Sequence, residues 1–360
     1  MRDFTSHSFL PLRSEHFPQH GNFAVAYHPD ADGFGALALL VRALPQAHFV
    51  IFSVDGPNRD LDPSQFQRML GMLQGGYLPV FLDHTPASSL QMQEIIRLQT
   101  PLYIDHHAMP DSFQAFLPQI RTHHPVFFDP ARHDAYATGL QAFQIFGEHS
   151  SELPFVLLSL LGDNKLHDWP LLRSMCPELI EPLQELAFEI NLAGLTRPCG
   201  GYRPHLTDAL FEEAFFKCLS AFREGGFQAF IRIFSFTLLA KRARQLRNKI
   251  NQQKQIVYQS ILQKQRHIRI DDPCDILPPV LLKWAFQELD FSGPFLFFQV
   301  DSLAHQVHFA LMQKHSSFHC AHAIQSHPLL QGGGHVDRAG AVGLEDDLPA
   351  ILQSFSFAGV

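Results

Sequence analysis

The first half of the chain alternates short apolar runs with segments that carry apolar residues at helical spacing. Helical patterns follow two of the runs, GALALLVRAL after the first and ASSLQMQEIIRL after the third. The apolar runs are residues 23–28 (FAVAYH), 48–54 (HFVIFSV), 77–84 (YLPVFLDH) and 101–107 (PLYIDHH). Short buried strands that alternate with helices are typical of a parallel, doubly wound α/β sheet.

The second half has a different pattern. From about Ala221 to Arg266 the spacing is helical and polar, which predicts one long connecting helix. Its basic residues are most simply a solvated face, and guidance of a substrate is the minority interpretation. Beyond it come the strand-like runs GPFLFFQVD and QVHFALMQ, a glycine loop QGGGHVDRAGAVG and a short terminal helix.

Composition narrows the class of protein. The chain has 360 residues, 46 % of them hydrophobic, and a formal net charge of −8. That length allows two domains, and that charge argues against sequence-independent binding of long duplex DNA. Five cysteines without a C-x-x-C pair, no apolar leader in MRDFTSHSFLPLR and no apolar run near the ~20 residues of a membrane span predict a cytoplasmic protein without membrane association.

Acidic side chains follow the first apolar run. Asp30 and Asp32 are two residues apart, so in an extended segment they point to the same side. Two carboxylates so placed repel each other unless a cation lies beside them. The alternative is that Asp32 caps the next helix and Asp30 is solvated.

Other apolar runs also end in acid or histidine. For Asp83-His84 the alternative interpretation is a helix cap, and for Asp163 it is an ordinary paired carboxylate. The groups are Asp83-His84, Asp105-His106-His107 and Asp163. Because strands of one parallel sheet end at the same edge, these groups are expected to meet. Carboxylate with some imidazole suits Mn²⁺ or Mg²⁺ better than structural zinc, and paired ions are a common device for cleaving phosphodiesters.

The motifs H-x-D-x-D-G, D-H, D-H-H, G-D-N and G-G-G-H occur in this order along the chain. Together they resemble the DHH phosphoesterase superfamily with a DHHA1 domain, which includes RecJ-type exonucleases, nano-RNases, cyclic-dinucleotide phosphodiesterases and family II pyrophosphatases. The resemblance covers most of the chain. It implies a catalytic DHH domain with a parallel doubly wound sheet (1–205), a helical linker (206–269) and a smaller α/β DHHA1 domain for substrate binding (270–360).

The resemblance also implies a metal centre with two ions. Asp83 would bridge the ions, and His107 would face the phosphate, which makes these two the expected catalytic residues. The implied ligands are His28, Asp30 and Asp83 for one ion, and Asp32, Asp83, His106 and Asp163 for the other.

In the second domain the resemblance implies a phosphate-binding loop of Gly332, Gly333, Gly334 and His335. Consecutive glycines let backbone N–H groups approach phosphate oxygens, although QGGGH alone would be read as a flexible turn. Arg338 stands where the family pattern has a small residue, and it would either clamp a phosphate or fill space at the surface.

The expected function is therefore a two-metal, Mn²⁺-dependent phosphodiesterase, with Mg²⁺ as the alternative ion. The expected substrates are short single-stranded oligonucleotides or linear dinucleotides, cut to mononucleotides, and the resemblance leaves room for a homodimer. The alternatives are a RecJ-like exonuclease for single-stranded DNA, a cyclic-dinucleotide phosphodiesterase, a polyphosphate or pyrophosphate hydrolase, and a non-catalytic scaffold.

Overall fold

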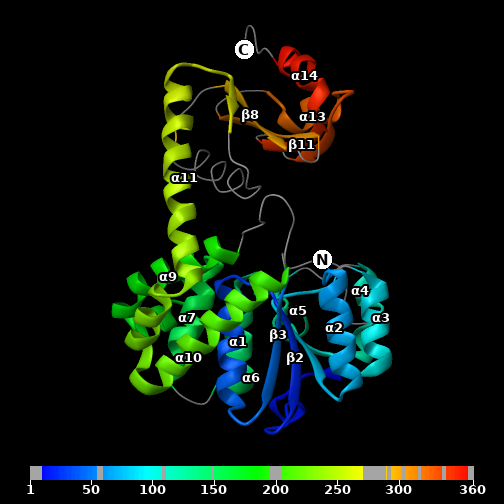
Figure 1. The fold of residues 1–360 in the computed structure, drawn as a ribbon, viewed down its shortest axis with the longest axis vertical. Coiled ribbons are helices and arrows are strands. Elements are labelled where there is room, and N and C mark those ends of the chain that lie inside the picture. The colour runs from blue at the N-terminus through cyan, green and yellow to red at the C-terminus, as the bar shows by residue number, and fades with distance from the viewer. Residues whose placement is uncertain are drawn as a thin grey trace. The chain divides into compact units, whose positions relative to one another are not determined.

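The chain folds into two compact units, each with its own sheet and hydrophobic core. The first comprises Met1–Leu195 with Arg203–Arg244, and the second comprises Thr196–Tyr202 with Gln245–Val360 (Figure 1). The computed structural model describes residues 10–54, 60–86, 88–107, 111–147, 150–194, 204–270, 289, 293–301, 305–314, 318–334 and 338–355.

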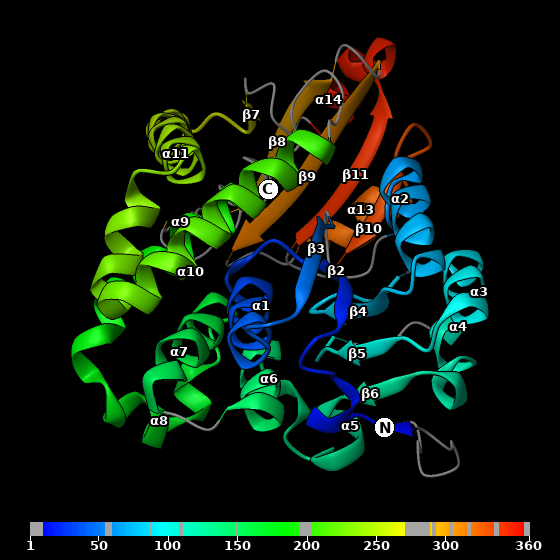
Figure 2. The same cartoon turned by 60° about the horizontal axis from the view of Figure 1, so that its bottom comes forward.

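The sheet of the first unit is parallel throughout, as the alternating pattern predicts (Figure 2). Its strand order is β1-β6-β5-β4-β2-β3. The strands are β1 (Leu10–Pro11), β2 (Asn22–Tyr27), β3 (His48–Ser53), β4 (Leu78–Leu82), β5 (Leu102–Ile104) and β6 (Arg121–His123). The four apolar runs of the first half form β2, β3, β4 and β5.

Helices cover both faces of this sheet, so the fold is doubly wound (Figure 2). One face packs against α1 (Ala31–Ala43), α6 (Thr138–Phe146), α7 (Leu153–Gly162), α9 (Ile180–Gly194) and α10 (Pro204–Ser235). The other packs against α2 (Pro63–Gln74), α3 (Ser89–Leu98) and α4 (Asp111–Gln114). Two further short helices are α5 (Pro125–Phe128) and α8 (Pro170–Met175).

Strand β2 shows why its sequence is a continuous apolar run. Phe23, Val25 and Tyr27 lie in the core on the α1 side, whereas Ala24 and Ala26 lie in the core on the α2 side. All five are fully buried. A strand buried on both faces cannot alternate apolar with polar residues, and each buried large side chain contributes about 1.5–3 kcal/mol.

The predicted single helix from Ala221 to Arg266 is wrong. The segment contains the end of α10 and a separate helix, α11 (Leu238–Leu262). Within α10 the helical geometry is interrupted at Gly226, which has a φ of 68°. Thr237 then begins α11, because its hydroxyl accepts a hydrogen bond from the backbone N–H of Ala240 at 3.2 Å. Helical periodicity does not register such breaks, because the apolar spacing continues across them.

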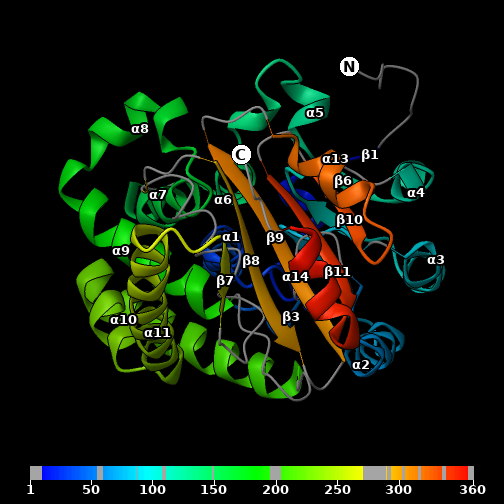
Figure 3. The ribbon, with the colours of Figure 1, turned by 90° about the horizontal axis from the view of Figure 1, so that it is seen from above.

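The second unit has a mixed sheet in the order β10-β11-β9-β8-β7 (Figure 3). Strand β7 runs parallel to β8, and the other neighbours are antiparallel. Helices α13 (Cys320–Gln325) and α14 (Leu348–Ser354) pack into the same core. The strands are β7 (His267–Arg269), β8 (Gly293–Asp301), β9 (Gln306–Lys314), β10 (Gln331–Gly334) and β11 (Arg338–Leu344).

The predicted glycine loop is instead largely sheet. Gly332, Gly333 and Gly334 form β10, which pairs with β11. A Cβ atom at Gly332 would lie 2.1 Å from the carbonyl oxygen of Gly340, so close strand packing requires glycine there. His335 lies outside the described residues. In the part of the chain that the structure describes, every helix is too short or too polar to cross a membrane.

Candidate metal centre

The candidate site forms at the carboxyl ends of β2, β4 and β5, which are neighbours in the sheet. His28 follows β2, Asp83 follows β4, and Asp105 with two histidines follows β5. Backbone hydrogen bonds align these ends: His28 N–H donates to Leu82 O at 3.3 Å, and Asp83 N–H donates to Ile104 O at 3.0 Å. The sheet topology therefore brings the predicted residues to one edge.

A tight turn places Asp30 and Asp32. Asp30 caps α1 by accepting a hydrogen bond of 2.9 Å from Gly33 N–H, so the alternative that Asp32 is the cap is wrong. A Cβ atom at Gly33 would lie 2.0 Å from the carbonyl oxygen of His28. Only glycine lets the chain fold back this closely between β2 and α1.

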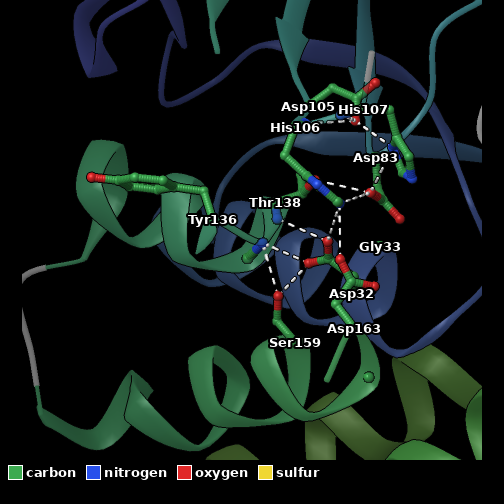
Figure 4. Close-up of polar contacts among 12 residues, drawn as sticks. Asp32, Gly33, Asp83, Asp105, His106, His107, Tyr136, Thr138, Ser159 and Asp163 are labelled. Atoms are coloured by element: carbon green, nitrogen blue, oxygen red, sulfur yellow. Dashed lines mark hydrogen bonds and ion pairs between the residues drawn. The ribbon is translucent and has the colours of Figure 1, made fainter. Parts of the chain in front are cut away.

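Asp32 is fully buried and is held from a second helix (Figure 4). Its carboxylate accepts hydrogen bonds from Thr138 N–H at 2.8 Å and Gly139 N–H at 2.9 Å, and another from the hydroxyl of Ser159. The two backbone donors are the first residues of α6, where the helix dipole favours negative charge. Burial raises the pKa of Asp32, but His106 and these hydrogen bonds outweigh it, so the pKa lies far below its usual value.

Asp83 lies between His28 and His106 in the candidate metal centre. Its Oδ2 atom is 3.4 Å from His28 Nδ1, and its Oδ1 atom is 3.4 Å from His106 Nε2. Thr138 Oγ1 donates a hydrogen bond of 3.0 Å to Oδ1. Asp83 has a φ of 54°, a strained conformation for a residue with a side chain, and the cap of α3 is Ser88. The helix-cap alternative for Asp83 is therefore wrong.

Burial, followed by the nearby charges of Asp32 and Asp30, raises the pKa of Asp83 to about 7. Three carboxylates close together in a buried place are unfavourable without positive charge. His28 supplies part of that charge: burial lowers its pKa, but Asp30 and Asp83 outweigh burial and raise it well above the usual value. The electrostatics favour a bound cation.

Among the described residues, the side chains form three groups whose ligand atoms lie within 4.8 Å of one another. Two of them match the predicted ligand sets: His28, Asp30 and Asp83, and Asp32, His106 and Asp163. The third consists of Asp83, Asp105, His106 and His107. His28 Nδ1 is buried and faces both carboxylates of its set, at 2.9 Å from Asp30 Oδ2 and 3.4 Å from Asp83 Oδ2. The contact of the buried Asp83 Oδ2 atom with His28 is too long for a strong hydrogen bond, so this oxygen is available as a ligand. Carboxylate and imidazole donors of this kind suit Mn²⁺ or Mg²⁺.

Asp163 and His106 meet at the end of α7. His106 Nε2 lies 2.9 Å from Asp163 Oδ2 and 3.2 Å from Asp32 Oδ2 (Figure 4). Burial lowers the pKa of His106, but Asp163, Asp32 and Asp83 together raise it well above the usual value. His167, one helical turn after Asp163, has a side chain that is 68 % exposed and is not part of the site.

Asp105 lies within the site, although the sequence interpretation gave it no role of its own. It is fully buried, and its Oδ1 accepts hydrogen bonds from His107 Nδ1 at 2.7 Å and from the His106 and His107 backbone N–H groups. Its Oδ2 accepts from Tyr103 at 2.8 Å and Thr85 at 2.7 Å. The first position of the D-H-H motif therefore orients the third.

The sequence interpretation also did not identify Lys165 as a residue of the site. Its ammonium lies 3.0 Å from Asp163 Oδ2 and 2.6 Å from His106 Nδ1. It stands two residues after Asp163, and that spacing was the one signal in the sequence that could have identified it. Thr138 and Ser159 had no such signal, because single hydroxyl residues on apolar helices are common.

The structure thus brings all six predicted metal ligands and His107 together in the first unit. The predicted phosphate-binding residues belong to the second unit, where Arg338 is exposed at the start of β11. No family model and no curated protein matches the chain.

Solved structures do match. The exonuclease RecJ bound to manganese has a TM-score of 0.58 and 16 % identity, with 97 % of this chain and 94 % of that chain covered. RecJ in complex with Mn²⁺ from Thermus thermophilus gives 0.51 and 16 %; 96 % of this chain matches 55 % of that longer chain. The DHH domain of a member of a family of ribosomal proteins gives 0.51 and 13 %, with 94 % and 86 % covered.

Proposed function

We propose that this chain, which has the fold of the DHH phosphoesterase superfamily, is a Mn²⁺-dependent phosphodiesterase with two metal ions. Its substrates are short single-stranded oligonucleotides or linear dinucleotides, which it hydrolyses to mononucleotides. Mg²⁺ is the alternative ion.

The observation that carries the proposal is the position of Asp83. Its two oxygen atoms face different ligand sets, Oδ2 toward His28 and Oδ1 toward His106, each at 3.4 Å. A carboxylate placed in this way can be shared by two ions. When bound, such ions neutralise charge on a phosphate and activate water for attack.

The chain's own residues prepare this chemistry. The carboxylates of Asp32 and Asp83 are held by donors from α6, so they are oriented before any ligand arrives. His107 is held through its Nδ1 by Asp105, which leaves Nε2 to face a phosphate oxygen. Burial lowers the pKa of His107, but Asp105 and Asp83 outweigh it and raise the pKa, which favours the charged, hydrogen-bond-donating form.

Two observations support the substrate class. RecJ, the structure with a TM-score of 0.58, is an exonuclease bound to manganese. The net charge of −8 disfavours extended electrostatic binding of a long nucleic acid and suits short substrates.

We also propose that residues of the second unit bind the substrate, namely Gly332, Gly333, Gly334, His335 and Arg338. The proposed location is the cytoplasm, which fits the free thiols of Cys176, Cys218 and Cys320.

A RecJ-like exonuclease for single-stranded DNA is the second candidate. The match to manganese-bound RecJ over 94 % of that chain favours it. So does the basic stretch Lys241–Arg247 at the start of α11, which could contact a longer strand.

A product ladder separates the candidates. Purified protein with Mn²⁺ is given end-labelled single strands, from dinucleotide to about 24-mer, as RNA and as DNA. Asp83→Ala and His106→Ala are run beside it, with Asp134→Ala as a matched control because its side chain is 93 % exposed. We expect rapid cleavage of the shortest chains only, lost in the first two variants and retained in the control.

Other outcomes have definite meanings. Stepwise shortening of long DNA would establish the exonuclease instead. Cleavage that survives Asp83→Ala would contradict the proposed metal centre. Failure to cut any strand would overturn the proposal and direct the search to cyclic dinucleotides and polyphosphate, and then to a scaffold.

A further inference from the structure

Lys165 is placed by a well-defined helix ending. Asn164, with a φ of 58°, ends α7 in the left-handed conformation. The Lys165 N–H donates to Leu160 O at 2.7 Å, and the Asn164 N–H donates to Leu161 O at 3.1 Å. This pair of bonds is a Schellman motif, which fixes the backbone on both sides of Asn164. Asp163 and Lys165 therefore emerge from a rigid turn into the same site.

The Lys165 side chain lies inside the metal centre and is only 15 % exposed. Its Nζ atom donates to the backbone oxygen of Tyr136 at 2.5 Å and lies 3.0 Å from Asp163 Oδ2. That same carboxylate oxygen lies 2.9 Å from His106 Nε2. The Lys165 ammonium therefore contacts a carboxylate oxygen that belongs to the ligand set Asp32–His106–Asp163.

Lys165 also contacts the ring of His106. Its Nζ atom lies 2.6 Å from His106 Nδ1, and the other ring nitrogen, Nε2, faces Asp32 and Asp163. A divalent ion held by Asp32, His106 and Asp163 would therefore face the like charge of the Lys165 ammonium.

We propose that Lys165 is a built-in cation that holds the ligand set Asp32–His106–Asp163 in the absence of metal and leaves His106 when a divalent ion binds there. Its ammonium then binds a phosphate oxygen of the substrate, while Tyr136 O still restrains it. The second half of this inference rests on the proposed function, and the first half does not. Lys165 is thus both a competitor of the metal and a specificity residue for anionic phosphate.

The test compares Lys165→Met with Lys165→Arg, which keeps the charge, and with Lys217→Met, which removes an exposed lysine paired with Glu213. Mn²⁺ binding is measured without substrate by the electron paramagnetic resonance signal of free Mn²⁺. We expect Lys165→Met to bind the more weakly held ion about tenfold more tightly, because a like charge has been removed. Lys165→Arg and Lys217→Met should bind Mn²⁺ as the unmodified chain does.

The phosphate half is tested by calorimetric titration of inorganic phosphate at saturating Mn²⁺. Lys165→Met should weaken phosphate binding about tenfold, and Lys165→Arg should weaken it less. A purely structural role would weaken both Mn²⁺ and phosphate binding, and that result would overturn the inference, as would unchanged Mn²⁺ affinity. If Lys165→Met does not fold, Lys165→Gln takes its place, with the same expected directions.

This test can fail separately from the proposed function. An enzyme that cleaves dinucleotides but shows no gain in Mn²⁺ affinity in Lys165→Met leaves the function standing and removes the competition by Lys165. If the chain cleaves nothing but Lys165→Met binds Mn²⁺ more tightly, the competition by Lys165 stands and the proposed function fails.

Discussion

His107 donates a hydrogen bond of 2.7 Å from Nδ1 to the Oδ1 atom of Asp105, a carboxylate that is itself fully buried. The opposite oxygen of Asp105 is held by Tyr103 and Thr85. Burial raises the pKa of Asp105, but His107 and His106 lower it far more, so the group stays ionised. Asp105 therefore fixes the direction of the His107 ring without belonging to either of the two predicted ligand sets.

Substitution of this carboxylate should damage turnover more than metal binding. We expect Asp105→Asn to lower kcat about 10–100-fold, because the amide cannot hold His107 in its charged form as the carboxylate does. Mn²⁺ affinity should change only a few-fold, since His106 and Asp83 keep their positions. Steady-state kinetics on a dinucleotide and a Mn²⁺ titration measure the two effects. Tyr103→Phe, which removes one of the hydrogen bonds to Asp105, is the milder control; an unchanged kcat in Asp105→Asn would contradict this role.

The turn at Gly33 gives a prediction about stability. Gly33→Ala places a Cβ atom against the His28 carbonyl, where the space is 2.0 Å, so the turn must open. We expect a loss of about 1–3 kcal/mol in the free energy of unfolding, together with weaker Mn²⁺ binding through His28. Gly71→Ala is the matched control, because a Cβ atom there meets nothing within 4 Å; it should stabilise α2 by up to about 1 kcal/mol. Thermal unfolding monitored with and without Mn²⁺ distinguishes the two, and equal effects would contradict the steric argument.

The raised pKa of Asp83 predicts how metal stabilisation depends on pH. Its folded pKa of about 7 lies above the ordinary 3.8, so the metal-free folded state holds a proton that the unfolded state releases. The contribution of this group to stability therefore falls as pH rises from about 4 to 7. Mn²⁺ reverses the trend, because it needs the ionised carboxylate.

The increase in Tm caused by Mn²⁺ should accordingly grow between about pH 5.5 and about pH 7.5, values chosen to bracket a pKa of about 7. His28 and His106 act in the same direction: their raised pKa values mean that protonation competes with metal at lower pH. Thermal shift assays across this range, with chelator as the reference, measure the effect. A Mn²⁺-induced shift that is constant with pH would show that Asp83 is not a ligand.

The sequence predicts the arrangement of β2, β4 and β5 and the residues that follow them, because apolar strands and their polar ends are visible along the chain. It does not predict the hydrogen bonds that hold these residues in place. Thr138 and Ser159 reach Asp32 from helices 106 and 127 residues away in the chain, and nothing local marks these residues. The interruption at Gly226 was missed for a different reason, since a positive φ leaves the apolar spacing unchanged.

For the glycines of the second unit, the sequence predicted a feature that the structure does not have. Consecutive glycines favoured a loop, whereas Gly332 lies in β10 because the neighbouring strand approaches too closely for a side chain. Tertiary packing, and not backbone freedom, is the physical reason for glycine at this position.

The most direct test of the account is a count of metal ions around Asp83. Protein freed of metal is titrated with Mn²⁺ and followed by electron paramagnetic resonance, beside Asp83→Ala and Asp134→Ala. Two ions per chain with magnetic coupling between them, lost in Asp83→Ala and retained in Asp134→Ala, are the predicted result. A single ion, or two uncoupled ions that survive Asp83→Ala, would contradict a shared carboxylate and with it the proposed two-metal chemistry.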